Sequence, residues 1–205
     1  MASTTLKAAN VNRELLRQRV ADKYRNVALN PELGFHFHNG APLARMVGYE
    51  EADILALPAS VVESFAGTGN PFIFGNMRPG ETVIDVGCGA GFDTLLAARQ
   101  VGPHGRVIAV DMTGEMRRKA EAGARELDLA NVQVLDGFAE SLPAGDAIAD
   151  AVISNGVVNL CPDKLAVFRE MYRVLKPGGR MQVGDIVVHK EVPQHAKDDI
   201  DLWSG

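Results

Sequence analysis

Three glycines and two aspartates form the clearest chemical pattern in the sequence. Asp85 is followed by Gly87, Gly89 and Gly91, and Asp111 follows Gly91 by 20 residues. Glycines after a buried strand let the backbone turn tightly and let a ligand approach the main chain. An acid about 20 residues further on is typical of sites where a carboxylate accepts from ribose hydroxyls. The pattern therefore predicts a nucleoside-bearing cofactor at the carboxyl ends of two strands.

The type of cofactor depends on the third glycine and on Asp85. Dinucleotide sites use Gly-x-Gly-x-x-Gly, and this chain has Phe92 where the third glycine would stand. The Asp85 carboxylate would repel a pyrophosphate, but it can help to receive an ammonium group. S-adenosylmethionine carries adenosine, an ammonium and a sulfonium, so it fits better than NAD. A strand-end acid that caps local amides is the alternative for Asp85.

Hydrophobic patterning places this turn in a regular series of elements. Strands are predicted at 81–86, 106–110, 131–135, 149–154 and 180–188, and helices at 11–29, 52–66 (interrupted at Pro58), 92–101, 113–127 and 162–175. Strands that alternate with helices at this spacing indicate right-handed crossovers. We therefore expect an α/β fold with a Rossmann-like, doubly wound parallel sheet.

Details of three helices follow from local signals. Thr113 is expected to cap the helix that it begins, and Gly123 to allow close packing of that helix. Pro162 suits the first position of its helix. The apolar spacing in that helix predicts a core face, which consists of Leu165, Phe168, Met171 and Leu175. Residues 193–203 resemble the start of one more helix.

Composition limits the classes of protein to consider. The 205 residues suit one domain with a small appendage, and the net charge of −5 disfavours nucleic acid as a partner. Two cysteines cannot make a disulfide framework, which favours a reducing compartment. The longest apolar runs fall short of the ~20 residues that cross a bilayer, and the first 20 residues lack the apolar core of a secretory signal. We expect a cytoplasmic protein without a membrane partner.

Several longer stretches carry a family resemblance. These are VIDVGCGAGFD, VIAVDMT, GFAESLP, DAVISNGVVNL and FREMYRVLKPGGRM, which together span about residues 80–188. In this order and spacing they resemble class I S-adenosylmethionine-dependent methyltransferases. VADKYRNVA near Tyr24, GTGNP at 67–71 and VISNGVVNLCPDK resemble the arsenite methyltransferase branch in particular. The resemblance implies S-adenosylmethionine as the cofactor and a sheet ordered 3-2-1-4-5, here lacking the last two strands of that fold.

The resemblance also implies roles for individual residues. The methionine and ribose part of the cofactor would lie against Gly87, Gly89 and Gly91, with Asp85 orienting the ammonium group. Asp111 would accept from the ribose hydroxyls, and Met112 would pack against the adenine. Many relatives place an acid where this chain has Phe138, so the adenine contact would be apolar, with the backbone of Ala139 supplying the polar part.

Two further residues are expected near the methyl group. Asn155 ends the fourth predicted strand and would face the transferable methyl. Tyr24 would close over the methionine end, or else serve as a core aromatic of the first helix.

The arsenic-binding cysteines of that branch are missing. Where the branch places two of them, this chain has Thr68 and Gly156. Trivalent arsenic is bound by thiolates, and the cysteines present, Cys88 and Cys161, are expected to be small packed residues. The sequence therefore predicts a methyltransferase whose acceptor is a small molecule other than arsenite, with no catalytic residue assigned. The alternatives are an S-adenosylmethionine-binding protein without methyltransferase activity and, more weakly, an NAD-dependent oxidoreductase.

The remaining expectations concern organisation. Residues 1–76 would form an N-terminal helix and an acceptor-site lid, and residues 77–205 the cofactor-binding domain. His36 and His38 would share one side of an extended segment, but two histidines make a poor metal site, so no metal is predicted. The fifth strand would lie at an edge with its apolar side chains poorly covered, namely Val183, Ile186, Val187 and Val188. We therefore expect a homodimer, or another molecule, to cover that edge.

Overall fold

A parallel sheet organises the chain. The computed structural model describes residues 11–33, 35, 37–190 and 192–204, and within them five strands pair in the order β3-β2-β1-β4-β5. The strands are β1 (Thr82–Val86), β2 (Arg106–Asp111), β3 (Val132–Asp136), β4 (Ala149–Asn155) and β5 (Leu175–Gly184), and every pairing is parallel. The predicted fold class and strand order are confirmed, with β3 and β5 at the two edges.

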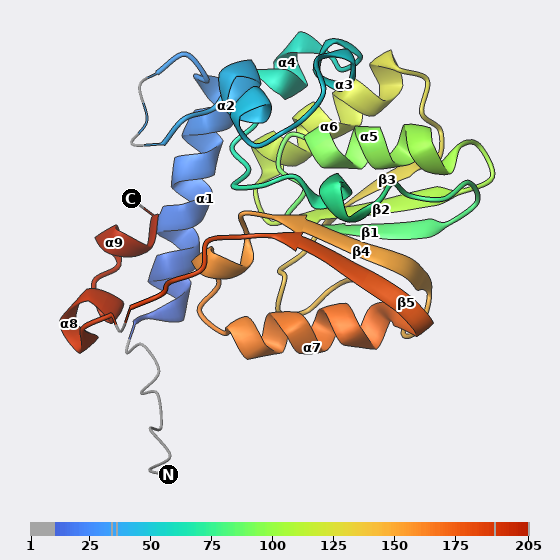
Figure 1. Ribbon diagram of the computed structural model, residues 1–205. Helices are drawn as coiled ribbons and strands as arrows, with labels where there is room; N and C mark the ends of the chain where they lie inside the picture. Colours follow the sequence, from blue (N-terminus) through green and yellow to red (C-terminus); the bar gives the residue numbers. More distant parts are fainter. Residues whose placement is uncertain (1–10, 34, 36, 191, 205) are drawn as a thin grey trace.

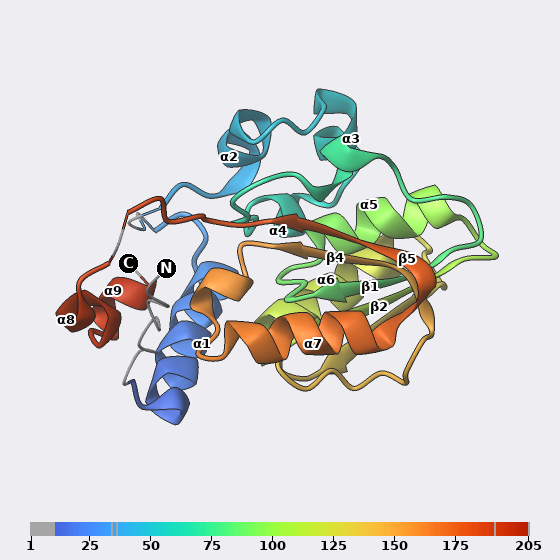
Figure 2. The ribbon, with the colours of Figure 1, turned by 60° about the horizontal axis from the view of Figure 1, so that its bottom comes forward.

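Helices cover both faces of the sheet (Figures 1 and 2). On one face lie α5 (Phe92–Val101) and α6 (Gly114–Glu126), and α7 (Lys164–Val174) covers the other face. The N-terminal segment contributes α1 (Arg13–Leu29), α2 (Gly40–Met46), α3 (Glu51–Leu55), α4 (Ala59–Val62) and the 3₁₀ turn η1 (Pro71–Phe74). In both views α1 stands at the sheet edge to which the carboxyl ends of the strands point.

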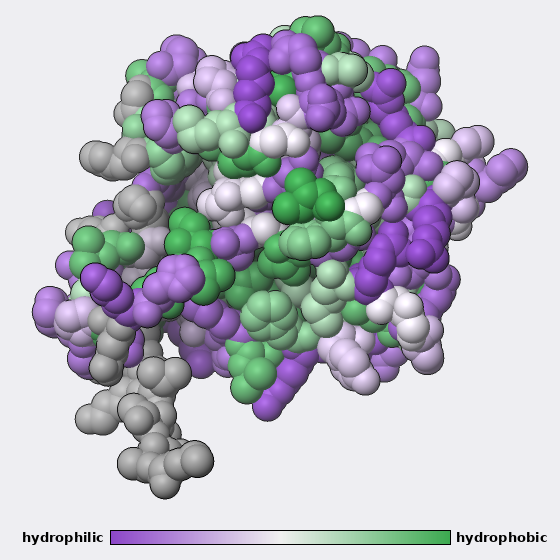
Figure 3. Space-filling model, viewed as in Figure 1, coloured by the Kyte–Doolittle hydropathy of each residue, from purple (hydrophilic) through white to green (hydrophobic). Residues whose placement is uncertain are grey.

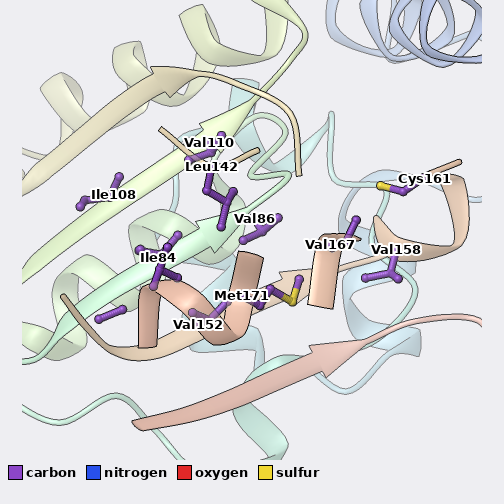
Figure 4. Packing of buried hydrophobic residues seen from close by; sticks show 12 residues of the cluster. Ile84, Val86, Ile108, Val110, Leu142, Val152, Val158, Cys161, Val167 and Met171 are labelled. Carbon is purple, nitrogen blue, oxygen red and sulfur yellow. The ribbon is translucent and has the colours of Figure 1, made fainter. Parts of the chain in front are cut away.

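The core forms two layers around the central strands. Beneath the sheet, Val167 and Met171 of α7 pack against a cluster that includes Ile84, Val86 and Val152 (Figure 4). Above the sheet, the N-terminal segment packs on α5 and α6 through an apolar cluster, whose buried members include Tyr49, Ile54, Val61, Phe65, Phe92 and Leu95. The N-terminal segment therefore shares a core with the sheet domain at the face where the glycine turn lies.

Helix α7 corrects two sequence predictions. It begins at Lys164, and Asp163 rather than Pro162 precedes it as the cap, accepting from the Ala166 N–H at 3.0 Å. Its buried side chains are Val167, Met171 and Val174. Two apolar stripes run along this helix, and the one that carries Leu165 and Phe168 faces outward, with exposed fractions of 58% and 43%. Periodicity finds both stripes and cannot tell which one the sheet covers.

The last strand and the chain that follows also differ from expectation. β5 begins directly after α7 and contains a bulge. The bulge is seen in the register, which shifts between the pairs Ala149–Leu175 and Ala151–Arg180. The strand ends at Gly184 instead of Val188, and Ile186, Val187 and Val188 lie beyond it, exposed. Asp185 ends the ladder by accepting from the N–H groups of Asn159 and Ile186. Residues 194–204 form two short helices, α8 (Gln194–Lys197) and α9 (Asp201–Ser204), where one was expected.

Helix α6 confirms one local prediction and corrects another. A Cβ on Gly123 would lie 2.8 Å from Val61 and 2.9 Å from Leu95, so close packing depends on glycine there. Thr113 stands at the N-cap, but its side chain makes no capping hydrogen bond to the described residues of the helix.

Candidate functional site

A cavity opens at the carboxyl ends of β1, β2 and β4, beneath α1. Its wall contains most of the residues that the sequence singled out, namely Tyr24, Asp85, Gly87, Gly89, Asp111, Met112, Phe138, Ala139 and Asn155. The central strands bring these residues together because parallel strands all end at the same edge of the sheet. The exception among the predicted residues is Gly91, which lies outside the wall.

The three glycines of the turn have three different tasks. Gly87 has φ +74°, and a Cβ there would lie 2.3 Å from the Val157 side chain, so glycine lets Val157 close over the turn. A Cβ on Gly89 would meet no atom of the described residues within 4 Å, so the backbone there is open to a ligand. Gly91 has φ +94°, and a Cβ there would lie 2.9 Å from the Ala120 Cβ of α6. Glycine there allows helix packing, and the ligand contact of Gly91 stays a prediction.

Asp111 holds the turn with one lone pair on each carboxylate oxygen. Its Oδ2 accepts from the Gly89 N–H at 2.9 Å, and its Oδ1 accepts from the Thr113 N–H at 2.7 Å. Burial raises the pKa of this carboxyl, and the two backbone donors act in the opposite direction. An ionised carboxylate offers about four acceptor positions, so two remain for a diol.

Asp85 is buried beside the turn, with one oxygen accepting from the Thr94 hydroxyl at 2.5 Å. Burial raises its pKa to about 8, and the neighbouring charges of Asp93 and Asp111 add to the effect. Its described partner is a side-chain hydroxyl, so Asp85 is not the cap of local amides that was the alternative. A cation placed here would favour the ionised form of Asp85.

The sequence analysis missed Asp93, which lines the cavity, and Tyr49, which lies behind it. The Tyr49 hydroxyl donates to Asp93 Oδ1, and the Asn155 amide nitrogen donates to Asp93 Oδ2 at 3.0 Å. Burial raises the pKa of Asp93 to about 6, and these two donors lower it. Burial and the Asp93 charge also raise the pKa of Tyr49 well above its ordinary value, so Tyr49 remains a donor.

Asn155 has a different setting from the one predicted. Its amide oxygen accepts from the N–H groups of Thr68 and Gly69 at 2.8 and 3.0 Å, and its nitrogen donates to the Gly69 carbonyl at 2.7 Å. A Cβ on Gly67 would lie 2.5 Å from the same amide. The side chain is thus occupied with the loop of residues 67–70, although it lines the cavity as expected.

Thr68 and Gly156, which occupy positions where the arsenite methyltransferase branch has cysteines, lie side by side. A Cβ on Gly156 would be 3.1 Å from the Thr68 Cγ2, and Gly156 has φ +71°. Cys88 and Cys161 are buried in the cavity wall, and burial raises the pKa of both thiols, that of Cys161 to about 12. Burial thus disfavours the thiolate forms that bind a soft metalloid.

The far end of the cavity carries an ion pair from α1. The Arg17 guanidinium lies 4.6 Å from the centre of the Phe138 ring and 3.2 Å from Glu140 Oε1. Glu140 is 10% exposed, and its Oε1 and the Arg17 Nε are buried without a hydrogen-bond partner among the described residues. Arg17 and Glu140 are further wall residues that sequence reasoning did not assign, although Glu140 stands in the GFAESLP stretch.

Tyr24 packs as a core aromatic of the first helix, and its closure over the methionine end of the cofactor stays a prediction. It lines the cavity and also packs on a cluster formed by Val27, Ala28, Ala90 and Met116. Burial raises its pKa to about 12, and the charges of Asp111 and Asp185 contribute. His38 lies exposed before α2, and His36 falls outside the described residues, so their predicted pairing stays untested.

Comparison with known proteins gives the family. Residues 77–204 match the family described as "Methyltransferase domain". An arsenite methyltransferase of Halobacterium salinarum is 46% identical over 159 residues, which cover 78% of this chain and 40% of that protein. A demethylmenaquinone methyltransferase of Listeria monocytogenes is 40% identical over 106 residues, which cover 51% of this chain and 44% of that protein. This chain spans less than half the length of these relatives.

Solved structures agree with this grouping. An arsenic(III) S-adenosylmethionine methyltransferase from Chlamydomonas reinhardtii matches with a TM-score of 0.65 and 38% identity, over 71% of this chain and 51% of that chain. An S-adenosylmethionine-dependent methyltransferase from Aquifex aeolicus shares the fold, with a TM-score of 0.51 and 22% identity, over 91% and 80% of the two chains. A [4+2]-cyclase also shares it, with a TM-score of 0.55 and 23% identity, over 86% and 60%.

The chain belongs to the methyltransferase-domain family and has the class I fold, and the cofactor of that family is S-adenosylmethionine. No helix in the described part of the chain is long and apolar enough to cross a membrane.

Proposed function

We propose that this chain binds S-adenosylmethionine in the cavity and transfers its methyl group to a small-molecule acceptor other than arsenite. The observation that carries the proposal is the pair of carboxylates, Asp85 and Asp111, on either side of an open glycine turn at the ends of β1 and β2. This arrangement has places for an ammonium group and a ribose diol, and its negative charge disfavours a phosphate beside the turn.

The residues present fit that cofactor. Asp85 would orient its ammonium group, Asp111 would accept from its ribose hydroxyls, and the open backbone at Gly89 leaves room between them. Met112, Phe138 and the backbone of Ala139 would enclose the adenine. Glu140 Oε1, which is ion-paired with Arg17, and Arg17 Nε add polar atoms at that end that make no hydrogen bond to the described residues.

When bound, S-adenosylmethionine supplies an already activated methyl group, so the chain mainly has to align the acceptor and exclude water. Apolar side chains, among them Phe65, Val157 and Leu160, wall the cavity near the loop of residues 67–70. The N-terminal helices lie over this end, and we propose that residues 1–76 act as acceptor-site lid and residues 77–205 as cofactor domain.

The choice of acceptor follows from the surroundings of Thr68 and Gly156. The two positions lie side by side, yet neither carries sulfur, and burial disfavours the thiolate forms of the two cysteines present. Arsenite as a three-thiolate complex is therefore not supported. For that reason we do not assign arsenite to this chain as its acceptor, although arsenite methyltransferases resemble it.

The proposal is tested by binding and turnover together. Calorimetry with S-adenosylhomocysteine measures cofactor binding, and formation of that product from S-adenosylmethionine is followed across a panel of phenols, quinols, thiols and amines. Product that forms only with an acceptor supports the methyltransferase. Binding with no turnover on any acceptor supports an S-adenosylmethionine-binding protein instead, since the fold alone does not fix the reaction. Failure to bind overturns both.

We also propose that a second copy of this chain covers the β5 edge. Hydrophobic side chains gather over β5 and the adjacent end of α7 (Figure 3). The exposed ones include Met181, Ile186, Val187 and Val188, at 38%, 59%, 73% and 62%, and Leu165 and Phe168 on α7. Sedimentation at tens of micromolar is expected to show a dimer that Val187→Asp converts to a monomer. A monomer for the unaltered chain would count against the dimer.

A further inference from the structure

A series of hydrogen bonds, buried at its Tyr49 end, connects Tyr49 to the loop of residues 67–70. The Tyr49 hydroxyl donates to one oxygen of Asp93, and the other Asp93 oxygen accepts from the Asn155 amide nitrogen. The Asn155 amide oxygen accepts from the N–H groups of Thr68 and Gly69. Groups from separate parts of the sequence thus meet in one line.

Two acceptors, the Asp93 carboxylate and the Gly69 carbonyl, decide which way the Asn155 amide points. An amide can turn over, exchanging its oxygen and its nitrogen, and an ionised carboxylate can only accept hydrogen bonds. The Asn155 nitrogen must face Asp93 and the Gly69 carbonyl, and its oxygen must face the N–H groups of the loop. The N–H groups of Thr68 and Gly69 in the loop donate to that oxygen at 2.8 and 3.0 Å. The reversed amide would place N–H against N–H and oxygen against oxygen.

Tyr49 fixes Asp93 in the same way. Its ring is buried, 5% exposed, with edge contacts to Phe65, Phe72 and Phe92. Its hydroxyl is therefore held at one place and donates to Asp93. Tyr49 lies outside the described cavity wall. Its hydroxyl also accepts from the Asn155 amide nitrogen at 3.1 Å, so it acts on Asn155 both directly and through Asp93.

The series of hydrogen bonds ends at the loop of residues 67–70, on the acceptor side of the cavity. Thr68 lies beside Gly156, and Gly69 approaches Gly184, with a Cβ on Gly69 only 3.2 Å from the Gly184 Cα. The loop therefore fits between the ends of β4 and β5 with little space to move. A shift of the Asn155 amide would move Thr68 directly.

We propose that Tyr49 and Asp93 are positioning residues that orient the Asn155 amide and so hold the 67–70 loop where the acceptor binds. This inference rests on the proposed function for the meaning of that loop, while the hydrogen-bond chain exists without it. Neither residue needs to touch the methyl group or the acceptor.

Amide hydrogen exchange tests the proposal directly, because the Thr68 and Gly69 N–H groups end the chain. In Tyr49→Phe, which keeps the buried ring, exchange protection of these two amides should fall roughly five- to tenfold, as for one lost buried hydrogen bond. The amide of Val107, bonded to the Asn131 carbonyl within the sheet, should keep its protection. Affinity for S-adenosylhomocysteine should stay within about twofold.

A second variant and a pH series separate positioning from general weakening. Asp93 faces Tyr49 and Asn155, and the carboxyl of Asp85 lies near enough to feel its charge. Protection of Thr68 and Gly69 should therefore fall as pH drops below about 6 in the unaltered chain, where Asp93 takes up a proton. In Asp93→Asn this pH dependence should be gone, whereas the control Asp128→Asn, at an exposed loop position, should retain it.

The matched control for the tyrosine is Tyr172→Phe, whose hydroxyl lies on α7 with 76% of the residue exposed. Unchanged protection of Thr68 and Gly69 in both Tyr49→Phe and Asp93→Asn would overturn the proposal. Equal losses at Val107 would do so as well, since they would show a role in overall stability only. These readouts need no methyl transfer, so they stand or fall separately from the proposed function.

Discussion

Removal of the Asp111 carboxylate should separate cofactor binding from folding. In the structure this group uses one acceptor position per oxygen on the Gly89 and Thr113 N–H groups. About two positions remain for ribose hydroxyls. Asp111→Ala therefore removes both a support of the turn and a part of the binding site.

The expected size follows from these contacts. Hydrogen bonds to a charged group contribute about 1.5–3 kcal/mol, so loss of the ribose contact should weaken binding by roughly 10- to 150-fold. If the unaltered chain binds at micromolar level, about −8 kcal/mol, the variant should bind at tens to hundreds of micromolar. Stability should fall by about 1–3 kcal/mol, because two backbone N–H groups lose their partner.

Calorimetry with S-adenosylhomocysteine and a thermal unfolding curve measure the two effects on the same sample. Asp136→Ala is the matched control: it removes a carboxylate from the end of the adjacent strand β3, 73% exposed and paired with Arg117. We expect less than about a threefold change in its affinity. A folded Asp111→Ala variant that binds as tightly as the unaltered chain would remove Asp111 from the site.

The other predictions concern the remaining charged, sulfur-bearing and apolar groups. The pKa of Asp85 is about 8 without ligand, so binding of a cationic ammonium at pH 7 should release up to one proton. The calorimetric enthalpy of binding should then change with the ionisation enthalpy of the buffer. An enthalpy that is the same in all buffers would argue against Asp85 as the ammonium partner. This folded-state pKa lies above that of an unfolded aspartate, ~3.9, so the stability contributed by this group should fall as pH rises from about 4 to 8, and Asp85→Asn should remove that slope in chemical unfolding. Arsenite should not be methylated, and turnover of arsenite that disappears in Cys88→Ser or Cys161→Ser would show that the two buried thiols do bind it. Finally, Met171→Ala should cost about 2–5 kcal/mol in urea unfolding and Leu165→Ala about 0.5 kcal/mol or less, because only Met171 is buried beneath the sheet; similar costs would place both side chains in the core.

The fold was predictable because it depends on spacing. Buried parallel strands consist of short apolar runs, and Gly87 and Gly89 identify the turn after β1. The strand order and the position of the cavity at the carboxyl ends of the strands could therefore be predicted. Asp111 could be found for the same reason, since the length of one strand–helix–strand unit sets its distance from the turn. These features are local or separated by a fixed length of chain.

Features that depend on packing between distant segments could not be predicted. Tyr49 comes from a stretch of short helices with weak periodicity, and its partner Asp93 lies 44 residues away. Nothing in the sequence indicates that Asn155 turns its amide to Thr68, 87 residues upstream. The orientation of α7 was missed for a related reason, because two apolar stripes compete and only the position of the sheet decides between them.

One electrostatic imbalance connects the cofactor end of the cavity with the acceptor end. The described wall holds the carboxyl groups of Asp85, Asp93, Asp111 and Glu140, against the single guanidinium of Arg17, which is paired with Glu140. Burial raises the pKa of each of the three aspartates, and the charges of Asp93 and Asp111 raise that of Asp85 further. A ligand with an ammonium and a sulfonium relieves this repulsion, whereas a phosphate would increase it. Asp93 contributes to this repulsion, because its charge is felt by Asp85, and Asp93 is also the group that orients the Asn155 amide. One carboxylate therefore belongs both to the charge that a cationic cofactor offsets and to the hydrogen bonds that hold the 67–70 loop.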